Sequence, residues 1–176
     1  MRNFFSGFFL FCASLTVSAQ ADWQSFIAID AGFRIKTPVS LELVEDSLQT
    51  DIGLVIHKTY YGQSEENRLV FLIHCYDYPE FTVHSDSTEL LAEFFEATLE
   101  EAIAAVDGEL KYNSPVSQQN YPGQRYRIDY LDGQASIKTQ AVMIRNRFIS
   151  VQVASPADLL YADLTTRFLD SFEVLE

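Results

Sequence analysis

The chain has 176 residues, of which 48% are hydrophobic and 14% aromatic, and its formal net charge is −13 at pH 7. This length and apolar content are typical of one folded domain with a sizeable core. The acidic excess argues against a protein that binds nucleic acid or anionic membranes, because such binding relies on basic contacts.

Residues 1–21 predict a secretory signal peptide. Arg2 precedes the apolar run FFSGFFLFCASLTVSA, which ends in small residues, and cleavage is expected near Ala19 or Ala21. The run is short of the roughly 20 residues that span a bilayer. Bulky residues in front of Cys12 disfavour the alternative of a lipid anchor. The protein is therefore expected to be periplasmic or secreted.

Residues 22–176 are expected to form a single domain with no stable membrane insertion. Loss of Arg2 leaves 11 basic against 25 acidic residues, a net charge of −14. Cys75 is the one cysteine left after cleavage, so no intramolecular disulfide can form and core packing must hold the fold.

The first half of this domain reads as strands followed by a helix. Residues 32–38 alternate apolar and polar side chains up to a proline, as an edge strand does. Residues 41–50 are a weaker segment, either strand or irregular. Residues 51–61 and 67–78 are rich in β-formers and predict a hairpin closed by a longer loop, GQSEE.

Residues 86–107 predict one long amphipathic helix. Asp86 and Glu89 have the spacing of a capping box, and Gly108 stands where a left-handed C-cap belongs. Apolar and small residues recur at helical spacing: Leu91, Phe94, Phe95, Thr98, Ala102, Ile103 and Val106. An acidic stripe lies opposite them and consists of Glu89, Glu93, Glu96 and Glu100. It is interpreted as the solvated face of the helix, and weak calcium binding or a basic partner is the alternative.

The second half predicts a β-meander and a closing helix. Four strands are expected, with Asp132-Gly133 and Arg145-Asn146 as turns: residues 109–119, 123–131, 134–144 and 147–154. The last helix is expected to begin at Ser155 as N-cap, with a buried stripe of Leu160, Leu164 and Phe168. Together these elements predict the α+β class, an antiparallel β-sheet with helices packed on both faces in an α/β/α sandwich.

His74 and Cys75 are adjacent, and neighbours on a strand point to opposite faces, so they cannot act as a pair. Cys75 is interpreted as a small core residue. His57 and His74 are expected to lie diagonally on one face of the hairpin, with His57 opposite Leu72. A metal site on these two histidines is the alternative, and it would need a third ligand.

His84 and Asp77 are the candidates for that third ligand, although Asp77 is expected on the opposite face. Neither HExxH nor paired CxxC spacing supports a metal. The sequence also holds no GxSxG, no P-loop and no GxGxxG motif. An enzyme is therefore not expected, and no cofactor is predicted.

Arg125 and Arg127 alternate on one strand face, and the Asp132-Gly133 turn would place Lys138 opposite Arg127. This is the one basic cluster in a very acidic chain. The favoured interpretation is pairing with the protein's own carboxylates, and docking of an anionic ligand or partner is the alternative.

Several motifs of this chain resemble the PsbP/Mog-like family. They are Tyr121-Pro122-Gly123, Asp132-Gly133, Arg145-Asn146-Arg147-Phe148, and Phe168-Leu169-Asp170-Ser171-Phe172, preceded by GFRIKTP, TDIG and YDYP in the first half. The resemblance covers most of the chain after the leader. It implies an antiparallel sheet sandwiched by helices and no catalytic residues. It also implies partner binding, since PsbP is an extrinsic accessory protein of the oxygen-evolving side of the photosystem and Mog binds a small GTPase.

The function expected from these observations is a non-enzymatic exported binding or accessory module that docks an envelope protein. The alternative is a small-ligand or metal-ion binding protein that uses the His57/His74 face or the Arg125, Arg127 and Lys138 patch.

Overall fold

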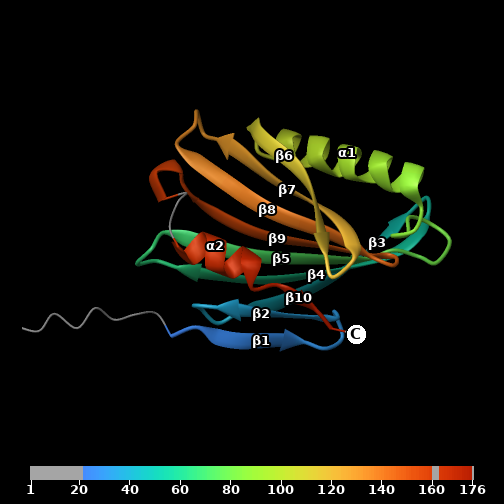
Figure 1. Ribbon diagram of the computed structural model, residues 1–176, viewed down its shortest axis with the longest axis horizontal. Coiled ribbons are helices and arrows are strands. Elements are labelled where there is room, and N and C mark those ends of the chain that lie inside the picture. The colour runs from blue at the N-terminus through green and yellow to red at the C-terminus, as the bar shows by residue number, and fades with distance from the viewer. Residues whose placement is uncertain (1–21, 160–162, 176) are drawn as a thin grey trace, which may run out of the picture.

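Two antiparallel sheets and two α-helices make up the described residues, 22–159 and 163–175, of a computed structural model (Figure 1). The larger sheet has the strand order β3-β4-β5-β9-β8-β7-β6. Its strands are β3 (Glu42–Thr50), β4 (Gly53–Ser64), β5 (Leu69–Asp77), β6 (Glu109–Gln118), β7 (Tyr121–Tyr130), β8 (Ala135–Ile144) and β9 (Arg147–Pro156).

The smaller sheet has the order β1-β2-β10. It is made of β1 (Gln24–Ala28), β2 (Phe33–Thr37) and β10 (Glu173–Val174). The helices are α1 (Thr88–Ala105), a short 3₁₀ turn at Ala157–Leu159, and α2 (Asp163–Asp170). The predicted signal peptide and its cleavage positions, as well as Leu160, lie outside the described residues.

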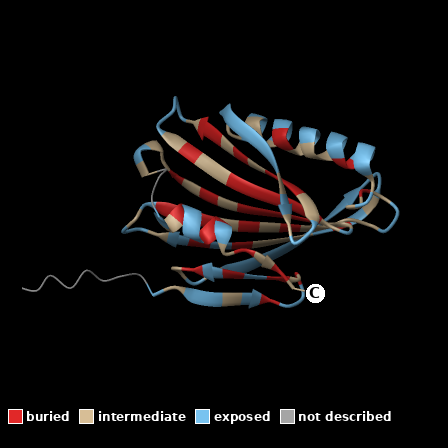
Figure 2. Ribbon diagram, in the orientation of Figure 1, coloured by how far each residue is buried: buried red, intermediate tan, exposed pale blue. Residues whose placement is uncertain are grey.

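Two hydrophobic cores lie on opposite faces of the larger sheet. One contains residues of β5, β9, the smaller sheet and α2, such as Phe71, Phe33 and Phe168. The other lies between β7, β8 and α1 and contains Tyr126, Met143 and Leu99. Figure 2 shows the buried residues running along the central strands, with the outer side of α1 exposed. Every other residue of β5 from Leu69 to Cys75 is buried, as expected of a central strand.

The predicted α/β/α sandwich with helices on both faces is wrong. The molecule is mainly β, and a three-stranded sheet supplies much of the layer opposite α1. β9 continues to Pro156, where the sequence suggested a helix N-cap at Ser155, and in the described residues α2 runs over Asp163–Asp170. Bulky residues on both faces of a strand require a covering layer, but they do not specify whether helix or sheet provides it.

The ends of α1 also differ from the prediction. The helix begins at Thr88 after Ser87, and no side chain caps it, so the capping box of Asp86 and Glu89 is not formed. Asp107, with φ of 48°, takes the left-handed conformation expected of Gly108. Gly108 is instead required for space, since a Cβ there would lie 2.4 Å from Cγ2 of Ile128.

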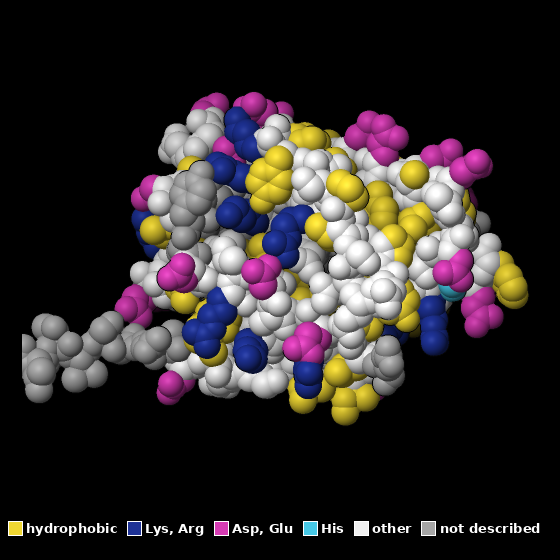
Figure 3. Space-filling view, in the orientation of Figure 1, with side chains coloured by type: hydrophobic (Ala, Val, Ile, Leu, Met, Phe, Trp, Pro, Cys, Tyr) yellow, Lys and Arg dark blue, Asp and Glu magenta, His cyan; other side chains and the backbone are white. Residues whose placement is uncertain are grey.

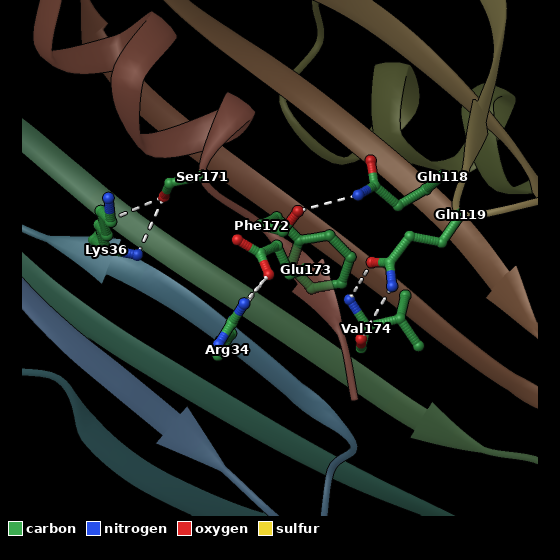
Figure 4. A network of polar contacts seen from close by, with 8 residues as sticks. All are labelled: Arg34, Lys36, Gln118, Gln119, Ser171, Phe172, Glu173 and Val174. Atoms are coloured by element: carbon green, nitrogen blue, oxygen red, sulfur yellow. Dashed lines mark hydrogen bonds and ion pairs between the residues drawn. The ribbon is translucent and has the colours of Figure 1, made fainter. Parts of the chain in front are cut away.

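A polar network attaches the C-terminal segment to both sheets (Figure 4). Arg34 of β2 donates from Nε to Glu173 Oε2 at 2.7 Å. On the other side, Gln119 accepts from the backbone N–H of Val174 at 2.6 Å and donates to its carbonyl at 3.1 Å. Gln118 donates to the Phe172 carbonyl at 2.9 Å. β10 is thereby held between β2 and the β6–β7 hairpin. The expected burial of Phe168 is confirmed, and Phe172 is buried as well.

Candidate functional site

α1 covers one half of its face of the larger sheet and leaves a groove beside strands β3 to β5. The groove has a volume of about 500 Å³. Its floor includes His74, Tyr76 and Ser150, and α1 contributes Glu101 and Ala102 to its wall. In the described residues, no helix is long and apolar enough to cross a membrane.

A cluster of His57, His74 and Thr59 lies next to this groove. Thr59 pairs with His74 across β4 and β5, and His57 pairs with Tyr76, so the two histidines are diagonal neighbours on one face, as expected. Nε2 of His57 lies 3.2 Å from Nδ1 of His74. The Thr59 hydroxyl lies 3.0 Å from the first nitrogen and 3.1 Å from the second. The three polar atoms therefore form a nearly equilateral triangle.

The register that produces this cluster differs from the expected one. Leu72 pairs with Tyr61 and not with His57. The hairpin loop begins after Ser64, because β4 continues through Gly62, Gln63 and Ser64. A glycine is needed at position 62 of this strand because the segment before β3 passes close to it. A Cβ on residue 62 would lie 2.5 Å from the Ser40 carbonyl oxygen. The sequence placed these residues in the loop.

Burial determines the charge of the two histidines. Burial and, to a smaller extent, the neighbouring His57 together lower the pKa of His74 to about 4. Burial also lowers the pKa of His57, against the opposing effect of the Asp46 carboxylate. The ring of His57 stacks on that of Tyr76, with centroids 4.1 Å apart. Both imidazoles are therefore neutral at pH 7.

Neither of the two expected third metal ligands reaches this cluster. Asp77 accepts a hydrogen bond from Arg147, its register partner on β9, and His84 lies within 3.4 Å of Asp86. Within residues 22–159 and 163–175, no group of three or more His, Cys, Asp and Glu side chains is placed to hold a metal ion. The third polar group at the cluster is Thr59, which the sequence did not single out.

Cys75 lies in the core on the opposite side of β5 and is 1% exposed. Burial raises the pKa of its thiol to about 12. The expectation that it is a core residue unable to act with His74 agrees with this position.

The basic cluster lies on the face of the sheet opposite α1. The expected register of Arg127 with Lys138 is observed. Arg127 makes two hydrogen bonds to Asp129, at 2.7 and 2.9 Å, and Arg125 donates to Asp170 at 2.8 Å. Burial and the two arginines lower the pKa of Lys138. Figure 3 shows Lys and Arg side chains gathered on this face with acidic side chains among them. Both arginines thus pair with carboxylates of the same chain.

The β3–β4 hairpin, residues 42–64, is the feature that the sequence did not reveal. All nine residues of β3 are exposed, and β3 forms one edge of the larger sheet. Its apolar side chains are half exposed: Leu43 52%, Val44 54% and Leu48 48%, with Leu54 of β4 at 52%. The segment LELVED, in which apolar and acidic residues are interspersed, was the available signal, but residues 41–50 were predicted as either strand or irregular.

The comparisons with known proteins give information on the fold only. No family model matches the chain, and no curated protein does. The solution structure of cyanobacterial PsbP (CyanoP) from Synechocystis sp. PCC 6803 is similar, with a TM-score of 0.56 and 16% sequence identity. The match covers 93% of this chain and 98% of that one. This likeness shows that the chain has a PsbP-like fold. It gives no support to the Mog-like part of the expected resemblance.

Proposed function

We propose that this protein is a non-enzymatic binding or accessory module that docks a protein partner in the cell envelope through its β3–β4 hairpin. The observation that supports this proposal is the exposed apolar surface of the hairpin. Leu43, Val44, Leu48 and Leu54 are each about half exposed within one supersecondary unit. Leu43 and Leu54 lie on one face of the hairpin, and Val44 and Leu48 lie on the other. Exposed apolar surface gathered in this way on a folded protein is typical of an interaction site. The PsbP-like fold is consistent with an accessory module, and the envelope location rests on the predicted leader.

The chemistry of the groove favours binding over catalysis. The Thr59 hydroxyl is 3.0 Å from His57, but a hydroxyl nucleophile needs a base whose pKa lies near the working pH. Burial lowers the pKa of both His57 and His74, and that of His74 to about 4. His74 is therefore a weak base, and the lowered pKa of His57 makes it a poorer proton acceptor for Thr59 than an exposed imidazole.

The proposal is tested by crosslinking the purified domain to isolated cell envelopes. Leu48→Glu and Leu54→Glu place charges on the hairpin, and Leu90→Glu is the matched control because Leu90 is 47% exposed on α1. The hairpin variants are expected to lose one specific crosslinked partner that the control retains. A partner captured equally by all three variants would contradict docking through the hairpin.

A metal-ion site is the second candidate, and the triangle of His57, His74 and Thr59 is the observation that favours it. Nitrogen and oxygen ligands about 2.0–2.2 Å from a tetrahedral zinc ion lie roughly 3.3–3.6 Å apart. The observed separations of 3.0, 3.1 and 3.2 Å are slightly shorter, so the three groups would move apart by a few tenths of an ångström to hold the ion. Mutual hydrogen bonds explain the same distances without a metal.

Zinc titration by calorimetry separates these two explanations. His74→Gln should abolish stoichiometric binding if the triangle holds the ion, whereas His84→Gln should leave it unchanged. Equal titration curves for both variants, or no binding by the parent domain, would remove the metal candidate.

A further inference from the structure

The two edges of the larger sheet differ in how they are protected. β6 carries Pro115 and an irregularity in register between Leu110 and Tyr112. Prolines and bulges interrupt the row of hydrogen-bonding groups that a foreign strand needs. β3 has neither, and it pairs with β4 through nine consecutive residues, from Glu42 opposite Tyr61 to Thr50 opposite Gly53. Among residues 22–159 and 163–175, the backbone of β3 is thus a regular edge that no strand covers and no proline or bulge interrupts.

The side chains of β3 can support an added strand on both faces of the sheet. Leu43 and Glu45 lie on one face, and Val44, Asp46 and Leu48 lie on the other. All of them are exposed. A strand placed beside β3 would bring its own side chains next to these, because neighbouring strands lie about 4.8 Å apart. Apolar contacts would then accompany the backbone hydrogen bonds on either face.

The charge of the hairpin specifies the chemistry of that strand. Residues 42–64 contain four acidic side chains, Glu42, Glu45, Asp46 and Asp51, and a single basic one, Lys58. Lys58 lies 3.4 Å from Glu45. A second copy of the chain is disfavoured, since an antiparallel β3 would place carboxylates against carboxylates, and like charges across strands destabilise pairing. Lysine or arginine side chains would be complementary.

We infer that the free edge of β3 binds an extended segment of the partner, which carries both apolar and basic residues, as an added strand. This inference rests on the proposed function and specifies its mode of recognition. Backbone hydrogen bonds to β3 provide affinity, and the carboxylates select basic segments and slow the association of acidic ones.

Amide hydrogen exchange tests the inference on the mature domain. The probe is a blocked peptide of alternating residues, (Val-Lys)₄, with (Val-Glu)₄ and an N-methylated (Val-Lys)₄ as comparison peptides. The basic peptide should slow exchange of amides within residues 43–50 at least tenfold. The acidic peptide should not, and neither should the N-methylated one, whose charge is the same but whose backbone cannot pair.

Variants with equal charge changes provide the second measurement. The triple change Glu42→Lys, Glu45→Lys and Asp46→Lys should weaken peptide binding at least tenfold. The matched triple change on α1, Glu93→Lys, Glu96→Lys and Glu100→Lys, should alter it less than twofold. Equal protection by the N-methylated peptide, protection at β6 and not at β3, absence of peptide binding, or a dimer formed through β3 would each overturn the inference. Loss of the envelope crosslink in Leu48→Glu would still support the proposed function in those cases.

Discussion

Nε2 of His57 lies 3.2 Å from Nδ1 of His74, and the two rings stack with centroids 5.4 Å apart. Two imidazoles at this separation cannot both be protonated at low cost, because like charges repel strongly where solvent is partly excluded. The pair therefore makes the stability of the fold depend on pH.

Acid should destabilise the domain through His74. Its pKa is about 4 in the folded state and near 6.5 when exposed. A group with a lowered folded pKa contributes its full stability above pH 6.5 and loses it as the pH falls towards 4. The loss should be on the order of 3 kcal/mol across that window. Urea unfolding at pH 7 and pH 4.5, followed by circular dichroism, measures it.

The control for this prediction is a comparison of two histidine variants. His74→Gln should reduce the difference in unfolding free energy between pH 7 and pH 4.5, whereas His84→Gln should preserve it. An unchanged pH dependence in His74→Gln would show that another group causes the acid sensitivity.

Cys75 should resist thiol reagents in the folded domain. The thiolate is the reactive form, and burial raises the pKa of this thiol to about 12, so little thiolate exists at pH 8. Labelling with an aromatic disulfide reagent should be at least a hundredfold slower in buffer than in concentrated urea. Rapid labelling of the native domain would mean that β5 opens on the timescale of the reaction.

Two glycine variants should separate steric conflict from backbone strain. A Cβ at Gly123 would lie 2.3 Å from the Ala141 carbonyl oxygen on the neighbouring strand. Gly133 has φ of 79° and open space around it. Gly123→Ala should cost about 3 kcal/mol or more, since a strand must move, and Gly133→Ala about 1 kcal/mol from strain alone. Equal melting temperatures for the two variants would contradict this order.

The partly buried pair of Arg127 and Asp129 should behave as a structural unit. Their side chains are 17% and 10% exposed. Asp129→Asn should cost about 3 kcal/mol because it leaves the arginine without its counter-charge, and the double change with Arg127→Met should cost less than the sum. A double-mutant cycle by urea unfolding measures the coupling. A coupling free energy near zero would contradict this prediction and would favour the alternative in which Arg127 binds an anionic ligand or partner.

Local patterns predicted the strands of the larger sheet well. The Asp132-Gly133 turn closes the β7–β8 hairpin, with positive φ at both residues. The runs 51–61 and 67–78 form β4 and β5 as expected. These features depend on residues close together in the sequence, so the pattern contains the information that decides them.

The layers that cover the larger sheet were harder to predict, because they form by contacts between segments that are distant in the sequence. β10 has only two residues and pairs with β2 across the whole domain, and nothing in its sequence indicates this partner. The two histidines were expected on one face of the sheet, but the residues that pair with them depend on where the hairpin loop begins. β4 extends past Gly62 to Ser64, and a glycine at that position suggested that the strand had already ended. β3 is exposed because, among the described residues, β4 is its one neighbouring strand, and the local sequence does not indicate that β3 lies at the edge.

The position of β10 has a consequence for the order in which the domain folds. β10 pairs with β2 through Glu173 and Arg34, which are 139 residues apart in the sequence. Contacts between such distant segments form late, because the chain between them must be ordered first. The core beneath β2, which includes Phe172 and Val174, therefore closes only after the larger sheet has formed.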